Sequence, residues 1–223
     1  GPRRLVPLLT PAAGACRWRA TRKLLPLRPL APLLSCLICS LAACTRGTPE
    51  PVSPSPSFAD VTAAAGIDFI HDSGASGRYA YPETFGAGAA WLDYDADGWL
   101  DLYLIQGGRV PGSEAEPKPN RLYRNNGSAE GVSGPGFVDV TERTGAGHVG
   151  YGMGAVAADL DANGATDLFL TNVGANALLL QTSGRFRDRA AASGVADPRW
   201  GTGTGVIDAD LDGDLDLVVV NYV

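Results

Sequence analysis

The chain is poor in the side chains that usually carry covalent or acid–base catalysis. Its 223 residues include four cysteines, two histidines and one methionine. All four cysteines lie within the first 44 residues, so the remainder has neither a cysteine nucleophile nor a disulfide. Neither His71 nor His148 belongs to a recognisable catalytic motif, and no Gly-x-Ser-x-Gly nucleophile motif is present. We therefore expect that the protein is not an enzyme, with a catalytic His71 beside Asp72 as the alternative.

Positive charge is scarce after position 44. Eleven of the 18 basic residues follow that position, against all 24 acidic residues, which gives this part a formal charge of −13. A domain of that charge repels the phosphates of nucleic acid. We therefore expect no nucleic-acid partner.

The first 44 residues have the opposite character, with seven basic residues and no acidic one. Residues 30–43 form an apolar run that is long enough for a signal peptide and too short to span a bilayer. The run ends in Leu41-Ala-Ala-Cys44, which resembles a bacterial lipobox, in which Cys44 becomes lipidated. Residues 1–44 are thus predicted to be a leader with a lipoprotein-type signal peptide. We expect an exported protein anchored at the outer membrane or cell surface; an ordinary signal peptide and a secreted protein are the alternative.

Residues 45–56 contain four prolines and few apolar side chains, which predicts a stiff, extended tether. Residues 57–223 hold the repeated sequence that defines the rest of the chain.

Three nine-residue stretches, 93–101, 159–167 and 208–216, share one acidic pattern. Aspartate occupies positions 1, 3 and 9, aspartate or asparagine position 5, and glycine position 6. Carboxylates crowded in this way repel one another unless a cation neutralises them. Ca²⁺ takes six to eight oxygen ligands, and glycine at position 6 permits the required turn. We therefore expect about three calcium sites, although a metal-free Asp-Gly turn is the alternative for any single loop.

The expected ligands are the side chains at positions 1, 3, 5 and 9 and the backbone carbonyl at position 7. In the first loop they are Asp93, Asp95, Asp97, Trp99 and Asp101; in the second Asp159, Asp161, Asn163, Ala165 and Asp167; in the third Asp208, Asp210, Asp212, Asp214 and Asp216. The loops are not EF-hands, because position 12 carries Leu104, Leu170 and Val219 where an EF-hand has glutamate.

The repeat extends beyond the loops. An aromatic residue followed by Gly-x-Gly begins eight residues before each loop, as in Phe85-Gly-Ala-Gly88. An apolar run typical of a buried strand follows each loop. Successive loops start at Asp93, Asp159 and Asp208, and a period near fifty with four short strands is typical of a propeller blade. We expect an all-β fold, a partial β-propeller of about two and a half four-stranded blades in an open arc. His71 is expected to end a further strand at 67–70.

The aromatic-Gly-x-Gly segment, the acidic loop and the strand that starts at Asn120 resemble FG-GAP/VCBS repeats, the blades of integrin-alpha-like propellers. The stretches 66–71 and 81–86 further resemble bacterial cartilage-acidic-protein-like proteins, which often carry an ASPIC/UnbV domain that is not found here. The resemblance implies calcium in the loops and a ring of about seven blades. Because about two and a half blades cannot close, we expect the chain to be a fragment.

These features predict a calcium-binding, surface-anchored propeller with a binding, adhesion or scaffolding role, in which calcium is structural. Its partner would be a protein or a glycan at the cell surface, and its membrane contact the lipid at Cys44. One alternative is an exported enzyme, of hydrolase or lyase type, or its accessory subunit, with catalytic residues in the missing part. Another is a structural component of a larger surface assembly.

Overall fold

The computed structural model describes residues 58–75, 77–108, 116–127 and 136–222. The predicted leader, signal peptide, lipidated Cys44 and tether fall outside these residues. The chain divides at Pro56, and the description below concerns the unit Ser57–Val223.

Within these described residues, ten strands form three antiparallel sheets, in which the strands follow chain order. The first sheet holds β1 (Ala89–Leu92), β2 (Asp101–Leu104), β3 (Arg121–Asn125) and β4 (Phe137–Asp139). The second holds β5 (Gly152–Ala158), β6 (Asp167–Asn172), β7 (Gly174–Thr182) and β8 (Arg185–Asp188). The third holds β9 (Gly201–Ile207) and β10 (Asp216–Asn221).

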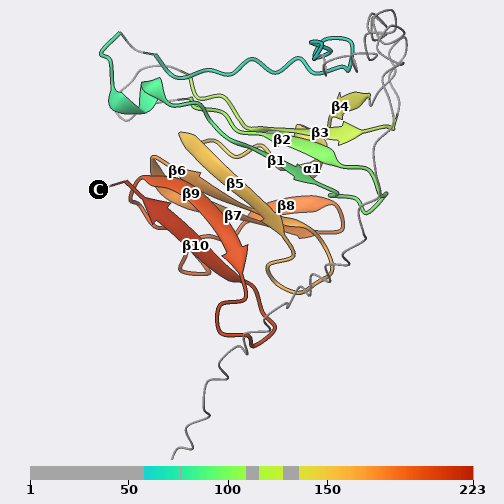
Figure 1. Ribbon diagram of the computed structural model, residues 1–223, viewed down its shortest axis with the longest axis vertical. Helices are drawn as coiled ribbons and strands as arrows, with labels where there is room; N and C mark the ends of the chain where they lie inside the picture. The colour runs from blue at the N-terminus through green and yellow to red at the C-terminus, as the bar shows by residue number, and fades with distance from the viewer. Residues whose placement is uncertain (1–57, 76, 109–115, 128–135, 223) are drawn as a thin grey trace, which may run out of the picture. The chain divides into compact units, whose positions relative to one another are not determined.

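The predicted all-β fold is confirmed, as a partial propeller with two complete blades and the first two strands of a third. The three acidic loops join β1 to β2, β5 to β6 and β9 to β10, so each loop connects the first two strands of a blade. Strand β5 contacts both β1 and β9, which places the first strands of successive blades side by side (Figure 1).

Two short helical segments were not predicted from the sequence. The 3-10 helix η1 (Tyr81–Thr84) precedes β1, and the single turn α1 (Thr141–Thr144) follows β4. The turn α1 ends at Gly145, whose φ of 73° is in the left-handed region that favours glycine. The Thr144 hydroxyl donates to the Val140 carbonyl, so a threonine side chain supports a turn too short for the helical periodicity to reveal.

The main core lies between the two complete blades. Tyr103, Ile105 and Leu122 of the first blade pack against Leu168 and Leu170 of the second, and all five are essentially inaccessible to solvent. Every residue of β6 is buried, because one face of the second blade meets the first blade and the other meets β9 and β10. This two-sided burial explains why the strands read as continuous apolar runs.

In each pair of glycines before a loop, one glycine lies against the neighbouring blade and lets the two blades approach closely. The Gly88 amide donates to the Met153 carbonyl at 2.8 Å, which bonds the entrance of β1 directly to β5. A Cβ at Gly152 would lie 2.1 Å from Cγ2 of Ile105, so no other residue fits there without displacing the neighbouring blade. The glycines therefore serve packing at the inner strands.

The segment 58–75 packs on the other face of the first blade. Ile67 and Phe69 contact a small core of Ala65, Tyr123 and Phe137. The strand expected at 67–70 is not formed: the Ile70 carbonyl accepts a hydrogen bond from the Gln106 side-chain amide at 3.1 Å. A side chain thus replaces the ladder partner that a strand would need. Among the described residues, no helix is long and apolar enough to cross a bilayer.

Candidate metal centres

The carboxylates at positions 1, 3 and 9 converge in all three loops. Each residue offers an oxygen within 4.8 Å of the other two, and the three groups are the triads Asp93, Asp95 and Asp101; Asp159, Asp161 and Asp167; and Asp208, Asp210 and Asp216. The structure thus brings together nine of the predicted side-chain ligands, three per blade.

The carboxylate at position 1 closes each loop by accepting two backbone amides. In the first loop Asp93 accepts from Asp97 at 3.1 Å and from Gly98 at 2.9 Å. The same pair of hydrogen bonds recurs at Asp159 and at Asp208. Because each carboxylate oxygen has two lone pairs, these bonds fix the side chain and leave capacity for a cation.

The loops also share an unfavourable backbone conformation at position 4. Ala96, Ala162 and Leu211 have φ values of 57°, 56° and 62°, in the left-handed region where a non-glycine residue costs about 1–2 kcal/mol. The same strain in three loops shows that the repeat enforces one geometry. A recurring outlier of this kind is typical of a ligand-binding turn.

In the two complete blades, the carboxylate at position 9 bonds the loop to the rest of the blade. Asp101 is fully buried and accepts the amides of Tyr94 at 3.0 Å and Asn125 at 2.8 Å. Asp167 is equally buried and accepts the equivalent amides of Leu160 and Gln181, at 2.9 and 2.6 Å. Burial raises the pKa of both carboxyls above the ordinary value. A cation beside them would offset that desolvation.

The side chains at position 5 lie outside the triads. Oδ1 of Asp97 accepts the Trp99 amide at 2.9 Å, and Oδ1 of Asn163 accepts the Ala165 amide at 2.8 Å. The Asn163 side chain also donates to the Gln181 carbonyl at 3.0 Å. Position 5 therefore closes the turn, and its predicted role as a ligand stays a prediction. The same is true of the carbonyls of Trp99, Ala165 and Asp214.

The donor set fits a hard cation. Asp161 and Asp210, at position 3, accept no hydrogen bond from any described residue, so their carboxylates are available to a ligand. Three carboxylates without nitrogen or sulfur are the ligands that calcium, magnesium and manganese prefer. Calcium tolerates an irregular cage and would complete its shell with further oxygens or water.

Arg124 distinguishes the first loop, and the sequence analysis overlooked it. Its Nε lies 2.6 Å from Oδ2 of Asp95 and its Nη2 lies 2.6 Å from Oδ2 of Asp97. Arg124 pairs with Val138 across the sheet, and Leu180 occupies the same register position opposite Arg187 in the second blade. Aligning β3 with β7 outward from the loop would have revealed this difference.

The second blade also holds the first loop. The Thr166 hydroxyl donates to the Asp93 carbonyl at 3.2 Å, and the Gln181 side-chain amide donates to the Tyr94 carbonyl. A change in the first loop would therefore reach the interface between the blades.

The family comparison agrees with this geometry. A family model described as FG-GAP-like repeat matches residues 93–170 and 159–219, and each match begins at position 1 of an acidic loop. No curated protein matches the chain. The matched residues cover more than half of the sequence and both complete loop-to-loop intervals, so the chain belongs to the family of FG-GAP-like repeat proteins.

Proposed function

We propose that this protein is a calcium-stabilised β-propeller displayed on a cell surface, where it binds, adheres or acts as a scaffold rather than catalyses a reaction. The observation that carries the proposal is the same carboxylate triad in each of three loops. Each loop joins the first two strands of its blade, so a bound cation would clamp that hairpin and the blade geometry. Calcium is thus structural in this proposal.

The position-3 aspartates offer the sharpest test, because Asp161 and Asp210 make no hydrogen bond with the described residues that their loss would break. Asp161→Ala and Asp210→Ala should each lower the melting temperature in millimolar calcium and leave it unchanged in excess chelator. At about tenfold above the Kd, one site contributes about 1.4 kcal/mol. In a unit of this size that free energy corresponds to about 3–6 °C.

Glu142→Ala is the matched control, since it removes an exposed carboxylate outside the loops. It should leave the melting temperature the same as the wild type in both buffers. Equal losses for Asp161→Ala in calcium and in chelator would contradict a metal role for the triads.

The surface location is proposed from the leader alone. The run at 30–43 and the lipobox-like Leu41-Ala-Ala-Cys44 support export and acylation at Cys44. Palmitate labelling in a bacterial host should mark the wild type and not Cys44→Ser; labelling of the variant would refute the anchor. The stretches 66–71 and 81–86 likewise support a kinship with bacterial cartilage-acidic-protein-like proteins.

A further inference from the structure

Three arginines stand on the outer strand of the second blade without an acidic partner. Arg185 and Arg187 belong to β8 and Arg189 follows it, and all three are exposed, whereas Phe186 between them is buried. Within the described part of the chain, no carboxylate pairs with any of the three guanidinium groups. Arg121, Arg124 and Arg199, by contrast, all form ion pairs. We call Arg185, Arg187 and Arg189 the arginine row.

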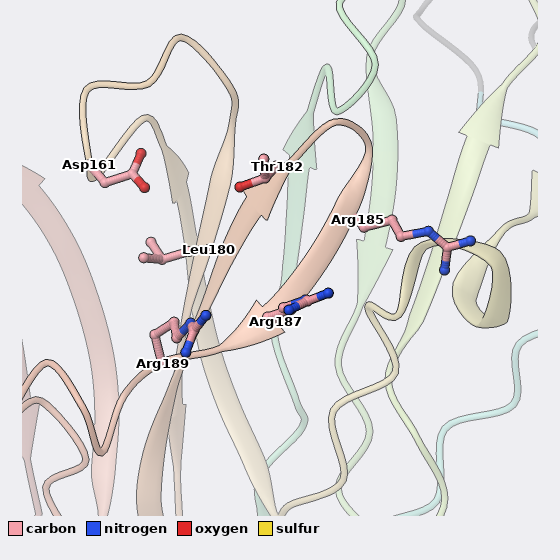
Figure 2. Close-up of a pocket in the computed structure, with 6 residues that line it drawn as sticks. All are labelled: Asp161, Leu180, Thr182, Arg185, Arg187 and Arg189. Carbon is pink, nitrogen blue, oxygen red and sulfur yellow. The ribbon is translucent and has the colours of Figure 1, made fainter.

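The arginine row lines a cavity of about 480 Å³. The other lining residues are Leu180 and Thr182, which pair with Arg187 and Arg185 across the sheet, and Asp161 of the second acidic loop. Figure 2 shows the arginines in succession along the strand, with Asp161 on the neighbouring loop and Arg185 extending away from it. The cavity therefore connects the row to the second candidate metal centre.

The repeat itself does not require these arginines. The sheet register aligns the three arginines with Gly136, Val138 and Val140 of the first blade. Val138 remains 49% exposed although the complete second blade packs beside it, whereas Gly136 and Val140 are buried. The position of Arg187 is thus open to solvent even in a blade with a complete neighbour. The first blade forms without these positive charges, which indicates that they serve a ligand and not the fold.

The spacing of the row selects the kind of ligand. Guanidinium groups on alternate residues of a strand recur about every 7 Å. Each one presents a planar fork that matches a carboxylate or a sulfate. The cavity lining contains no aromatic ring, which argues against the stacked bases of single-stranded nucleic acid and against the apolar anchors of a protein interface. A linear polymer with regularly spaced charges and hydroxyl groups fits better than a compact ion.

Charge density favours a glycan over nucleic acid. The part of the chain after position 44 carries a formal charge of −13, which repels a polyanion in proportion to its charge density. A nucleic-acid duplex has one charge about every 1.7 Å of its axis, about four times as dense as the row. We propose that the arginine row binds a linear anionic glycan whose sugars carry carboxylate or sulfate groups, with the Thr182 hydroxyl at the same site.

This inference rests on the proposed binding role and gives it a site and a ligand class. Calcium in the second loop would neutralise Asp161 at the end of the row, so calcium should strengthen glycan binding. The arginines need no metal of their own, and weaker binding should persist in chelator.

The test uses the full chain on immobilised polygalacturonate and chondroitin sulfate at low salt, with neutral dextran as the reference. Replacing all three arginines of the row by glutamine should weaken binding by about tenfold or more. The matched control, Lys118→Gln with Arg143→Gln and Arg199→Gln, removes three positive charges elsewhere and should leave binding unchanged. Arg187→Lys, which keeps the charge and loses the fork, should fall between the two.

Three results would overturn the proposal: no retention of the wild type on either anionic glycan, undiminished binding by the triple glutamine variant, or equal retention by single-stranded DNA or anionic vesicles. Circular dichroism of the variants guards against a loss through unfolding. The calcium-dependent melting of Asp161→Ala is independent of glycan binding, so this inference and the proposed function fail separately.

Discussion

The first and second acidic loops have the same backbone but differ in what faces their carboxylates. In both loops the carboxylate at position 1 accepts two backbone amides, and the residue at position 4 lies in the left-handed region. In both loops the carboxylate at position 9 is buried and accepts an amide from the third strand of the same blade. In the first loop Arg124 contacts Asp95 and Asp97, whereas in the second Leu180 stands at that register position and Asp161 has no partner in the described part of the chain. The repeat therefore builds the cage, and single residues that differ between the blades set its charge.

The same contrast continues inside the blades. Tyr103 of the first blade donates its hydroxyl to the Ala146 carbonyl and accepts from Asn120, whereas Phe169 stands at that position in the second blade. The Asn176 side-chain nitrogen, the counterpart of Asn120, is buried without a partner. The first blade thus has a polar network that the second lacks.

The largest effect is expected at position 9. Asp167→Ala leaves the buried amides of Gln181 and Leu160 without an acceptor and should destabilise the protein by about 3–5 kcal/mol in calcium-free buffer. Asp101→Ala should have the same effect, because its two hydrogen bonds are equivalent. Urea unfolding measures both. A difference above about 1 kcal/mol between them would show that the two cages are not equivalent.

A smaller effect is expected from exchanging the aromatic residues of the two networks. Tyr103→Phe leaves the Asn120 side-chain amide unpaired and leaves the Ala146 carbonyl with only the His148 amide as donor, which should cost about 2 kcal/mol. Phe169→Tyr offers the Asn176 side chain a partner and should stabilise by about 1 kcal/mol. Both values come from urea midpoints. Destabilisation by both changes would mean that the second blade has no room for the network.

An effect of similar size tests Arg124 as a competitor for the cation of the first loop. Arg124→Leu copies the second blade and should raise calcium affinity at the first loop by about tenfold, or about 1.4 kcal/mol. Leu180→Arg should weaken the second loop by a similar factor. Fluorescence of Trp99, at position 7 of the first loop, reports the first change, and Ala165→Trp places the same reporter in the second. Unchanged calcium affinity in both variants would show that Arg124 does not compete with the cation.

Much of the fold could be predicted because the repeat is written in local patterns. The Gly-x-Gly segments, the acidic loops and the apolar runs specify the first two strands of each blade, and the structure follows them. The expected strand at 67–70 is not formed: Ile67 and Phe69 show the alternation of a strand, but the Ile70 carbonyl accepts a hydrogen bond from the Gln106 side chain. An apolar alternation reports burial, not the ladder that defines a strand.

The candidate site was predictable in its carboxylates and not in their surroundings. Positions 1, 3 and 9 converge as the spacing implies, since they belong to one short loop. Arg124 lies on β3 and the arginine row on and just after β8, and the sheet register decides which side chains of these strands lie beside the loops. That register depends on contacts between distant residues, which spacing within one loop does not contain.

A crystal structure, determined from crystals grown in millimolar calcium, tests most directly the central claim that each acidic loop binds calcium. The account predicts one ion in each loop, about 2.3–2.6 Å from oxygens of all three triad carboxylates. Density at all three positions that refines as water, or no density at all, would contradict it.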